Sequence, residues 1–575
     1  MKATVACCFA LCVLLCTPCV RAQEDLVTSA MRDELDRSMK TLRLEKLAKP
    51  YFIAYRIQDS TITYASATLG SLRHSNTSHS RFLTVEMRVG DYALDNTNFI
   101  TSPGFAGISR GFPITLEDNY KELRRQIWLA TDAAYKRALG DLARKRAALE
   151  NRTRTEELPD FTKAQTTSLR DEAAPARVEQ AALEKMVREL SGLFRRMPEV
   201  YSSTVNLTVS EVLTRQIDSE GTAFARKTPE VTFRAVASTQ APDGMPLEDF
   251  VAAYGRSMSD LPSQEELAKQ IRQLGSHLAE LRSAPLPDRY IGPVLFEGQA
   301  AAELFGHVFV ANLLARRPPV SDNARFQSPA ENPFLDKMGA RVLPEGFDVV
   351  DVPTRDSYEG THLFGGYGID DDGVSARDVT LVEKGILKTL LSTRVPVRGV
   401  LETNGHRRGP GAAPSNVIVT TEKGLSDDEL RAELMRLVKQ RGLDYGMLVR
   451  RLSYGPRLPT LDPSGAAPSP GEANLTLVYK VFPDGHEELV RNTELSAITY
   501  TELKDIAAAS ASASVYTTTF SPGGSLASFR VPSLLFDDVT MKKPSGEIPK
   551  PPVVPSPLAD YANPKSSAGS DHNQH

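Results

Sequence analysis

The spacing of apolar residues predicts antiparallel strands in the first half of the chain. Residues 51–67 and 81–89 are rich in aromatic and β-branched side chains, and residues 205–238 alternate between apolar and polar positions around a turn at 219–221. Alternation with a period of two puts one face of a strand against a core and the other toward water. We therefore expect an antiparallel sheet from these segments.

Helical spacing of apolar residues is found in the same half of the chain. It covers residues 26–47, about 116–150, 178–195, 247–259 and 263–282. Each of these segments is long enough for an amphipathic helix. Between them, Asn151 to Arg177 is polar and lacks periodicity, which favours a loop or an exposed insertion. Pro285-Leu286-Pro287 is typical of a linker.

The pattern changes after residue 290. Residues 300–314 are apolar and rich in alanine, which is typical of a buried helix. Turn signals at 383–385 and 483–485 lie between strand-like runs and indicate β-hairpins. A capping box of Ser426 and Glu429 begins a further helix over residues 426–440, which ends at a glycine, Gly442.

These segments predict an α+β protein of two domains and a tail. Residues 23–285 are expected to form an amino-terminal α/β domain with a helical insertion. Residues 286–541 are expected to form a strand-rich domain. Residues 542–575 are dominated by proline, lysine and serine and are expected to be disordered.

The first 22 residues have the features of a secretory signal peptide. Lys2 precedes an apolar run from Ala3 to Val20, and Ala22 supplies a small residue at the expected cleavage site. A lipid anchor on Cys16 or Cys19 is the less favoured alternative. Cleavage after Ala22 leaves 575 − 22 = 553 residues and predicts export to the periplasm or the extracellular space.

The positions of the cysteines and the net charge argue against several classes of function. All five cysteines lie between residues 7 and 19, so the mature chain has no disulfide, thiolate ligand or cysteine nucleophile. A net charge of −4, without a basic stripe, argues against a nucleic-acid partner. No apolar run after the signal is long enough to span a bilayer.

The candidate chemistry is in the helix over residues 300–314. Glu303 and His307 are four residues apart and project from one face. They are either half of a metal site, with Glu303 as base or ligand and His307 as ligand, or an ordinary Glu–His pair on a helix. Both groups are unfavourable to bury in an apolar helix unless something pairs with them.

This helix resembles that of the TldD/PmbA (TldE) metallopeptidases, which carries His-Glu-x-x-x-His. The matching positions are Ala302, Glu303 and His307. Further matches follow in the family's order: Tyr367–Val374 to its Asp-Asp-(Glu/Asp)-Gly segment, Val382–Lys388 to the next hairpin, and Thr403–Arg408 to Asn-Gly-x-Arg-Arg. The resemblance covers most of residues 290–541 and implies a curved-sheet carboxy-terminal domain.

The resemblance also implies a zinc site and shows where this chain departs from it. In active members, two histidines and a cysteine near the end of the domain hold the zinc, and the glutamate is the general base. Here Ala302 replaces the first histidine, and the region around Thr517 to Gly524 has no cysteine. The motif is therefore degenerate, and a zinc ion at His307 and Glu303 needs ligands that the sequence does not identify. The PmbA-type branch also lacks the motif.

Other histidines are weaker candidates for a rebuilt site. The candidates for replacement metal ligands are His362, which has Asp356 and Glu359 in the same loop region, and His406. Each is also typical of a loop or surface position. His74 and His79 lie in a polar segment, His486 follows a turn, and His572 and His575 are in the tail.

Two charged runs have alternative interpretations. Asp370–Asp372 before Gly373 favours a turn over a calcium loop, because calcium loops alternate their ligands. Arg407 and Arg408 either clamp a carboxylate such as a peptide terminus or pair with carboxylates at the surface.

Two functions of different classes follow. In the family, the two halves frame an enclosed cavity, often between two subunits, and an extended peptide adds as a strand to a sheet. The resemblance thus implies a peptide or unfolded polypeptide as ligand and a homo- or heterodimer as assembly. The chain is either a metal-dependent peptidase or a pseudo-peptidase that binds peptide or a partner without hydrolysis.

Overall fold

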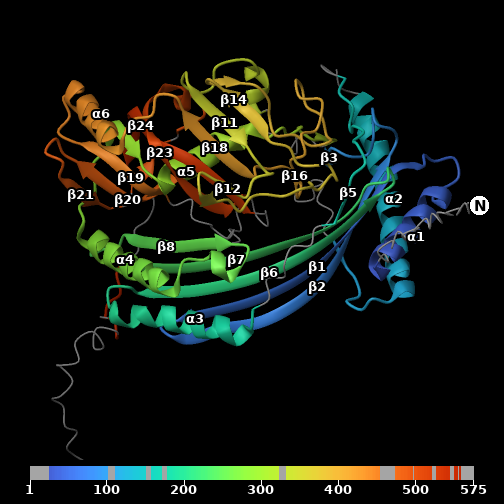
Figure 1. Cartoon of the computed structure of the whole chain (residues 1–575), viewed down its shortest axis with the longest axis horizontal. Helices are drawn as coiled ribbons and strands as arrows, with labels where there is room; N and C mark the ends of the chain where they lie inside the picture. The colour runs from blue at the N-terminus through green and yellow to red at the C-terminus, as the bar shows by residue number, and fades with distance from the viewer. Residues whose placement is uncertain are drawn as a thin grey trace, which may run out of the picture.

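The computed structural model describes residues 25–100, 111–150, 157–170, 178–322, 332–452, 473–520 apart from 492 and 497, 526–543, and 550–557 apart from 555. Strands and helices are mixed, which confirms the α+β class. Figure 1 shows a long curved sheet from the first half of the chain lying beneath a second sheet from the other half. Within the described residues, no helix has the length and apolar character needed to cross a membrane.

The amino-terminal sheet has the strand order β4-β2-β1-β6-β7-β5, and β8 pairs with β7. Its strands are β1 (Pro50–Thr68), β2 (Ser71–Val89), β4 (Phe112–Pro113), β5 (Ser168–Arg170), β6 (Ser202–Asp218), β7 (Ala223–Gln240) and β8 (Pro246–Gly255). β5 runs parallel to β7, and every other pairing is antiparallel. The strands predicted from alternating residues are confirmed.

One predicted helix, over residues 247–259, is wrong because this segment forms β8. It pairs with β7 from Gln240↔Pro246 to Val231↔Gly255, after a tight turn at Gly244. Leu247, Val251 and Ala253 face the helices that cover this sheet. The apolar residues in this short stretch fit both the helical period of 3.6 and the strand period of 2. The segment forms a strand because the edge of β7 beside it is otherwise unpaired.

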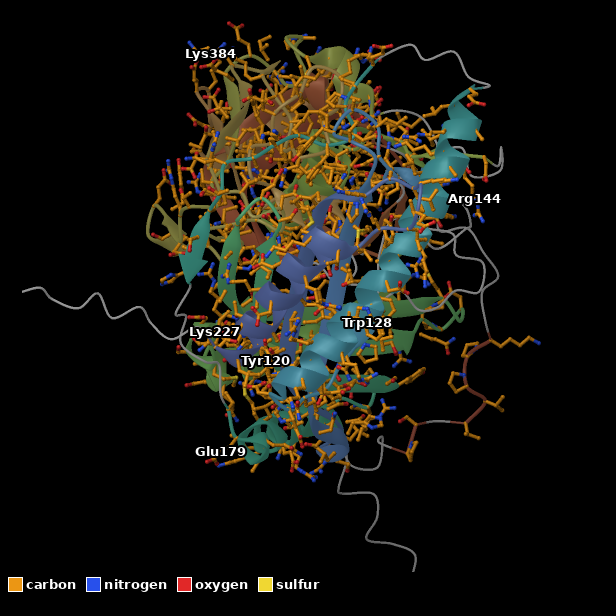
Figure 2. All side chains as sticks on the ribbon, turned by 90° about the vertical axis from the view of Figure 1, so that its right-hand side faces the viewer. Tyr120, Trp128, Arg144, Glu179, Lys227 and Lys384 are labelled. Carbon is orange, nitrogen blue, oxygen red and sulfur yellow. The ribbon has the colours of Figure 1, made fainter. Side chains whose placement is uncertain are left out.

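Helices cover one face of this sheet. They are α1 (Leu26–Thr41), α2 (Tyr120–Glu150), α3 (Gln180–Gly192) and α4 (Gln264–Ser283). α1 and α2 pack on Tyr55 and its neighbours, whereas α3 and α4 pack on Phe233 at the other end. α1 is six residues shorter than predicted. Figure 2 shows Tyr120, Trp128 and Arg144 along the length of α2.

The carboxy-terminal sheet has eleven strands in the order β15-β14-β11-β18-β24-β22-β20-β19-β9, with β21 on β20 and β23 on β24. They are β9 (Tyr290–Phe296), β11 (Phe347–Asp351), β14 (Val379–Glu383), β15 (Ile386–Leu387), β18 (Asn416–Thr421), β19 (Gly446–Leu452), β20 (Ala473–Val481), β21 (Glu487–Val490), β22 (Thr493–Leu495), β23 (Ile506–Thr519) and β24 (Leu526–Lys542). Both predicted hairpins are present, as β14–β15 and β20–β21.

Two helices cover opposite faces of this sheet. α5 (Gln299–Val308) packs on the side of Val294 and Phe296, and α6 (Asp427–Gln440) packs on the side of Leu295. The predicted capping box of α6 is confirmed, with Ser426 and Glu429 bonded to each other's backbone N–H. α5 ends at Val308, and the rest of its predicted range forms a 3₁₀ turn.

Short elements complete the described chain. They are β3 (Phe99–Ile100) with β10 (Val320–Ser321), β12 (Ser357–Tyr358) with β13 (Thr361–His362), β16 (Arg407–Arg408) with β17 (Gly411–Ala412), and 3₁₀ turns at Leu193–Arg196, Met258–Asp260, Val310–Leu313, Pro333–Lys337 and Glu502–Asp505.

Residues 157–167 form a loop, which confirms one of the two alternatives predicted for this segment, but the loop is not exposed throughout. Asp160 and Phe161 are each 1% exposed. Thr162 donates its backbone N–H to the carbonyl of Arg394, whose Nε donates back to the carbonyl of Thr162. The Phe161 ring lies between two guanidinium groups, with Cζ of Arg88 at 3.5 Å and Cζ of Arg394 at 3.9 Å from its centroid. This segment therefore ties the first half of the chain to the second.

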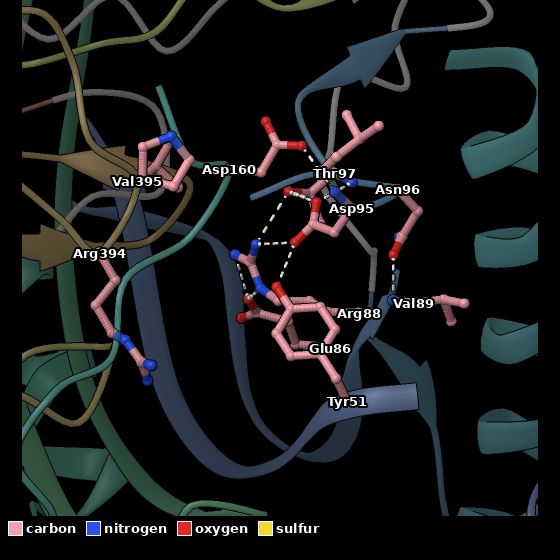
Figure 3. A network of polar contacts seen from close by, with 12 residues as sticks. Tyr51, Glu86, Arg88, Val89, Asp95, Asn96, Thr97, Asp160, Arg394 and Val395 are labelled. Atoms are coloured by element: carbon pink, nitrogen blue, oxygen red, sulfur yellow. Dashed lines mark hydrogen bonds and ion pairs between the residues drawn. The ribbon is translucent and has the colours of Figure 1, made fainter. Parts of the chain in front are cut away.

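Arg88 also belongs to a buried polar network with Asp95 and Tyr51, as Figure 3 shows. Arg88 donates to Glu86, to Oδ2 of Asp95 at 2.8 Å and to Thr97. The Tyr51 hydroxyl donates to the same Asp95 oxygen at 2.7 Å. Burial opposes ionisation here, but the carboxylates of Glu86 and Asp95 raise the pKa of Arg88 above its ordinary value. Every ionic group named is thus paired despite its burial.

Candidate functional site

Helix α5 holds Glu303 against the sheet of the second half. The chain leaves β9 through Gly298, whose φ of 54° favours glycine, and enters α5 directly. Ala300, Ala301 and Ala302 are fully buried, and their small side chains let the helix lie close to the strands. Since residues four apart share a face, Gln299 and Glu303 lie one above the other.

Glu303 is almost completely buried and is held by hydrogen bonds. Its side chain is 3% exposed. Gln299 Nε2 donates to its Oε1 at 2.8 Å, and the backbone N–H of Leu452 donates to its Oε2 at 3.1 Å. The Tyr516 side chain of β23 is also hydrogen-bonded to this carboxyl. Three elements of the second half therefore converge on Glu303.

Burial controls the protonation of Glu303. It raises the pKa of this carboxyl from 4.5 to about 7, although the hydrogen bonds from Gln299, Leu452 and Tyr516 act in the opposite direction. A carboxyl with this pKa exchanges a proton near neutral pH. That property suits a general acid or base, and it also suits a binding site whose hydrogen bonding changes with pH.

His307 is placed differently from Glu303. Its side chain is exposed to solvent, yet the surrounding protein still desolvates it and lowers its pKa to about 4. Both observations fit a ring that contacts solvent and is also close to many protein atoms. The imidazole is therefore neutral at pH 7, which is the form that binds metals or accepts hydrogen bonds.

The other candidate ligands do not join His307 in a metal cluster. Within the described residues, no three His, Cys, Asp or Glu side chains converge as metal ligands would. His406 is fully buried, with Nδ1 3.0 Å from both the backbone and side-chain oxygens of Asn404 and Nε2 3.4 Å from Asp351. His362 is exposed on the β12–β13 hairpin.

The acidic residues near His362 are used in ion pairs. Asp356 lies 3.2 Å from Arg256, and Glu359 pairs with Arg530. Both side chains are largely exposed, so these pairs contribute little stability.

The Asp370–Asp372 run forms the predicted turn and also joins the two halves of the protein. Oδ1 of Asp370 accepts backbone N–H groups of Asp372 and Val374, which closes the turn. Asp371 lies 2.8 Å from Arg226 of β7 and 3.7 Å from Arg56 of β1. Burial opposes the charge, but these two arginines lower the pKa of Asp371 well below its ordinary value.

The two arginines of β16 have separate environments. Arg407 lies 2.5 Å from Asp372 and 3.1 Å from Glu86 of β2, so its guanidinium joins the two halves. Arg408 donates Nη1 to the carbonyls of Pro414 and Leu526 and lies over the Tyr367 ring at 5.0 Å. No carboxylate of the described residues lies within ion-pair distance of Arg408. The two side chains therefore do not form one clamp.

Several residues of the site were missed by the sequence analysis. Tyr516 of β23 and Tyr254 of β8 lie near Glu303, and burial raises the pKa of both phenols. A cavity of about 290 Å³ lies beside them, lined by residues of α4, β8, α5, β19 and β23, and Gln299 and Tyr516 are shared between its wall and the Glu303 site. Gln299 was detectable from its spacing to Glu303, whereas the two tyrosines carry no signal in the sequence.

Residues 288–543 match the family model described as "PmbA/TldA metallopeptidase C-terminal domain". A metalloprotease of Methanothermobacter thermautotrophicus is 27% identical over 263 residues, which cover 43% of this chain and 52% of that protein. A metalloprotease of Methanocaldococcus jannaschii is 32% identical over 135 residues, which cover 23% of this chain and 26% of that protein. The chain thus spans about half the length of the first curated relative and about a quarter of the second.

The fold extends the similarity to the first half of the chain. The crystal structure of TldE from Thermococcus kodakarensis matches with a TM-score of 0.55 at 14% identity, over 89% of this chain and 99% of that one. At this identity the match concerns the fold alone.

Proposed function

Because this chain belongs to the TldD/PmbA family through its carboxy-terminal domain, we propose that it binds extended peptide or unfolded polypeptide between its two sheets. The observation that carries the proposal is the cavity beside Glu303, whose wall comes from β8 and α4 of the first half and from α5, β19 and β23 of the second. Phe250, Val251 and Ala252 are consecutive and all line it, so it lies along the outer edge of β8. An edge of this kind offers backbone groups to an extended ligand.

Zinc chemistry does not fit the described donor set. Ala302 has a methyl group where the family has a histidine, and Glu303 already accepts from Gln299 and Leu452. A catalytic zinc normally has three protein ligands, and His307 alone does not supply them. We therefore favour a pseudo-peptidase, in which Glu303 is hydrogen-bonded to Gln299 and Tyr516 of the cavity wall and no metal is held.

A metal-dependent peptidase remains the second candidate, favoured by the neutral, accessible imidazole of His307. Metal content separates the two. We expect the mature protein, dialysed against zinc at neutral pH, to retain no stoichiometric zinc and to match His307→Ala in this respect. One zinc per chain that disappears in His307→Ala would contradict the pseudo-peptidase and establish a rebuilt zinc site, whose hydrolytic activity a peptidase assay then measures.

Peptide binding is tested by blocking the cavity. We expect a permanently unfolded, labelled polypeptide to bind the protein, and Ala252→Trp at the edge of β8 to weaken the Kd by about tenfold or more, because the indole fills the space beside the strand. Ser276→Trp, at an exposed position on α4, is the control and should bind normally. Equal affinity for both variants, or no binding by the wild type, contradicts the proposal.

We also propose export to the periplasm or extracellular space, on the basis of residues 1–22, which lie outside the described residues. When the full chain is expressed in a bacterial host, the periplasmic or secreted fraction should contain a protein of 553 residues that begins at Gln23. Intact-mass measurement checks this. A full-length mass in the cytoplasmic fraction would disprove export, and the same measurement detects lipidation at Cys16 or Cys19.

A further inference from the structure

The cavity beside β8 has an unusual share of carboxamide groups in its wall. Gln270 and Gln273 come from α4, Gln299 comes from α5, and the Tyr516 hydroxyl group is nearby. Each carboxamide both donates and accepts hydrogen bonds. These carboxamides match a ligand group that also does both, and Phe250, Val251, Ala252 and Leu274 supply apolar contacts around it.

The ionic groups at this cavity already neutralise each other. Arg451 lines it, and its Nη1 lies 2.5 Å from Oδ1 of Asp249, which is 1% exposed. The same nitrogen donates to the carbonyl of Phe250 at 3.1 Å. A ligand carboxylate would lie near the carboxylate of Asp249, and a ligand cation would lie near Arg451. An uncharged group avoids both penalties, because burying a charge without a partner is unfavourable.

Two buried polar atoms at this cavity have no hydrogen-bond partner among the described residues. They are Oδ2 of Asp249 and Nδ1 of His277, which are 4.0 Å apart. His277 itself lines the cavity. Buried polar atoms are nearly always bonded in folded proteins, so this pair indicates that the site is completed by a polar group or water.

We propose that this cavity is a specificity pocket for one uncharged, hydrogen-bonding side chain of the bound polypeptide, a carboxamide or a hydroxyl. The proposal rests on the proposed peptide binding and names the class of residue that is selected. A volume of about 290 Å³ holds one such side chain together with ordered water. A ligand that lacks the polar group leaves the buried Nδ1 of His277 without a hydrogen-bond partner, which is the source of discrimination.

A peptide series tests the pocket. The series has four alanine-based peptides with terminal lysines, which carry three consecutive Gln, Leu, Glu or Lys residues. The Kd of each peptide is measured by fluorescence anisotropy. For the wild type we expect the Gln peptide to bind about tenfold more tightly than the Leu, Glu and Lys peptides. Gln270→Leu and Gln273→Leu should reduce this preference by weakening the binding of the Gln peptide. Gln264→Leu, exposed on the same helix and outside the cavity, should keep the preference.

The outcomes separate the two proposals. Equal affinity for the four peptides, or a preference for a charged one, overturns the specificity pocket and leaves peptide binding intact. A preference for Gln that persists in both cavity variants also overturns it. Failure of every peptide, and of the unfolded polypeptide, removes the proposed function and the pocket with it.

Discussion

Arg88→Met should lower the free energy of unfolding by about 3–5 kcal/mol, the range for breaking a buried ion pair by removing one partner. Arg88 is 3% exposed and Asp95 is fully buried, so the substitution leaves a carboxylate without its cation in the interior. The guanidinium also loses its contact with the Phe161 ring. Denaturant titration followed by circular dichroism measures the change.

A matched variant shows whether burial is the cause. Arg73→Met removes an arginine from an exposed position of the same strand, β2, and should change the stability by less than about 0.5 kcal/mol. Adding Asp95→Asn to Arg88→Met should recover part of the loss, because the unpaired charge is then absent. Equal effects of Arg88→Met and Arg73→Met would show that the network in Figure 3 contributes nothing.

The second large effect concerns pH. Burial raises the pKa of Glu303 from 4.5 to about 7, so the folded protein keeps this proton when the unfolded chain has lost it. The folded state binds more protons between these two values, and stability from this group, fully present below pH 4.5, is therefore lost as pH rises toward 7. At 1.36 kcal/mol per pKa unit the loss is about 3 kcal/mol.

Glu303→Gln removes the titration and keeps the shape of the side chain, but its NH2 group replaces one of the two oxygens that accept N–H donors. The stability of the variant relative to the wild type should be about 3 kcal/mol more favourable at pH 8 than at pH 4. Denaturant titrations at the two pH values give the difference. Glu345→Gln, at an exposed position, serves as the control. The same stability difference for Glu303→Gln at both pH values would contradict the raised pKa.

Local patterns in the sequence were sufficient for much of the fold. The strands around residues 51–67 and 205–238, the hairpin at 383–385 and the capping box at Ser426 depend on side chains close together in the chain, and each is confirmed. Helix α5 was also predictable, and with it the shared face of Gln299 and Glu303.

Contacts between residues far apart in the chain explain two differences between the sequence predictions and the structure. Residues 247–259 have apolar spacing that fits a helix, but β7 offers an edge to pair with and the segment becomes β8. The polar character of residues 157–170 suggested exposure, yet Asp160 is buried because Lys145 and Arg317 neutralise it there. No local signal reports a partner that lies far along the chain.

The sequence by itself determined the family resemblance, the order of most elements and the position of Glu303 and His307 on one helix, since these follow from motifs and local periodicity. Only the tertiary structure decided that Tyr516 reaches Glu303, that Asp371 and Arg407 join the two halves, and that Arg408 stands apart from Arg407. The physical reason is that burial and charge pairing arise when distant segments pack together, and they set the protonation and hydrogen bonding of a site.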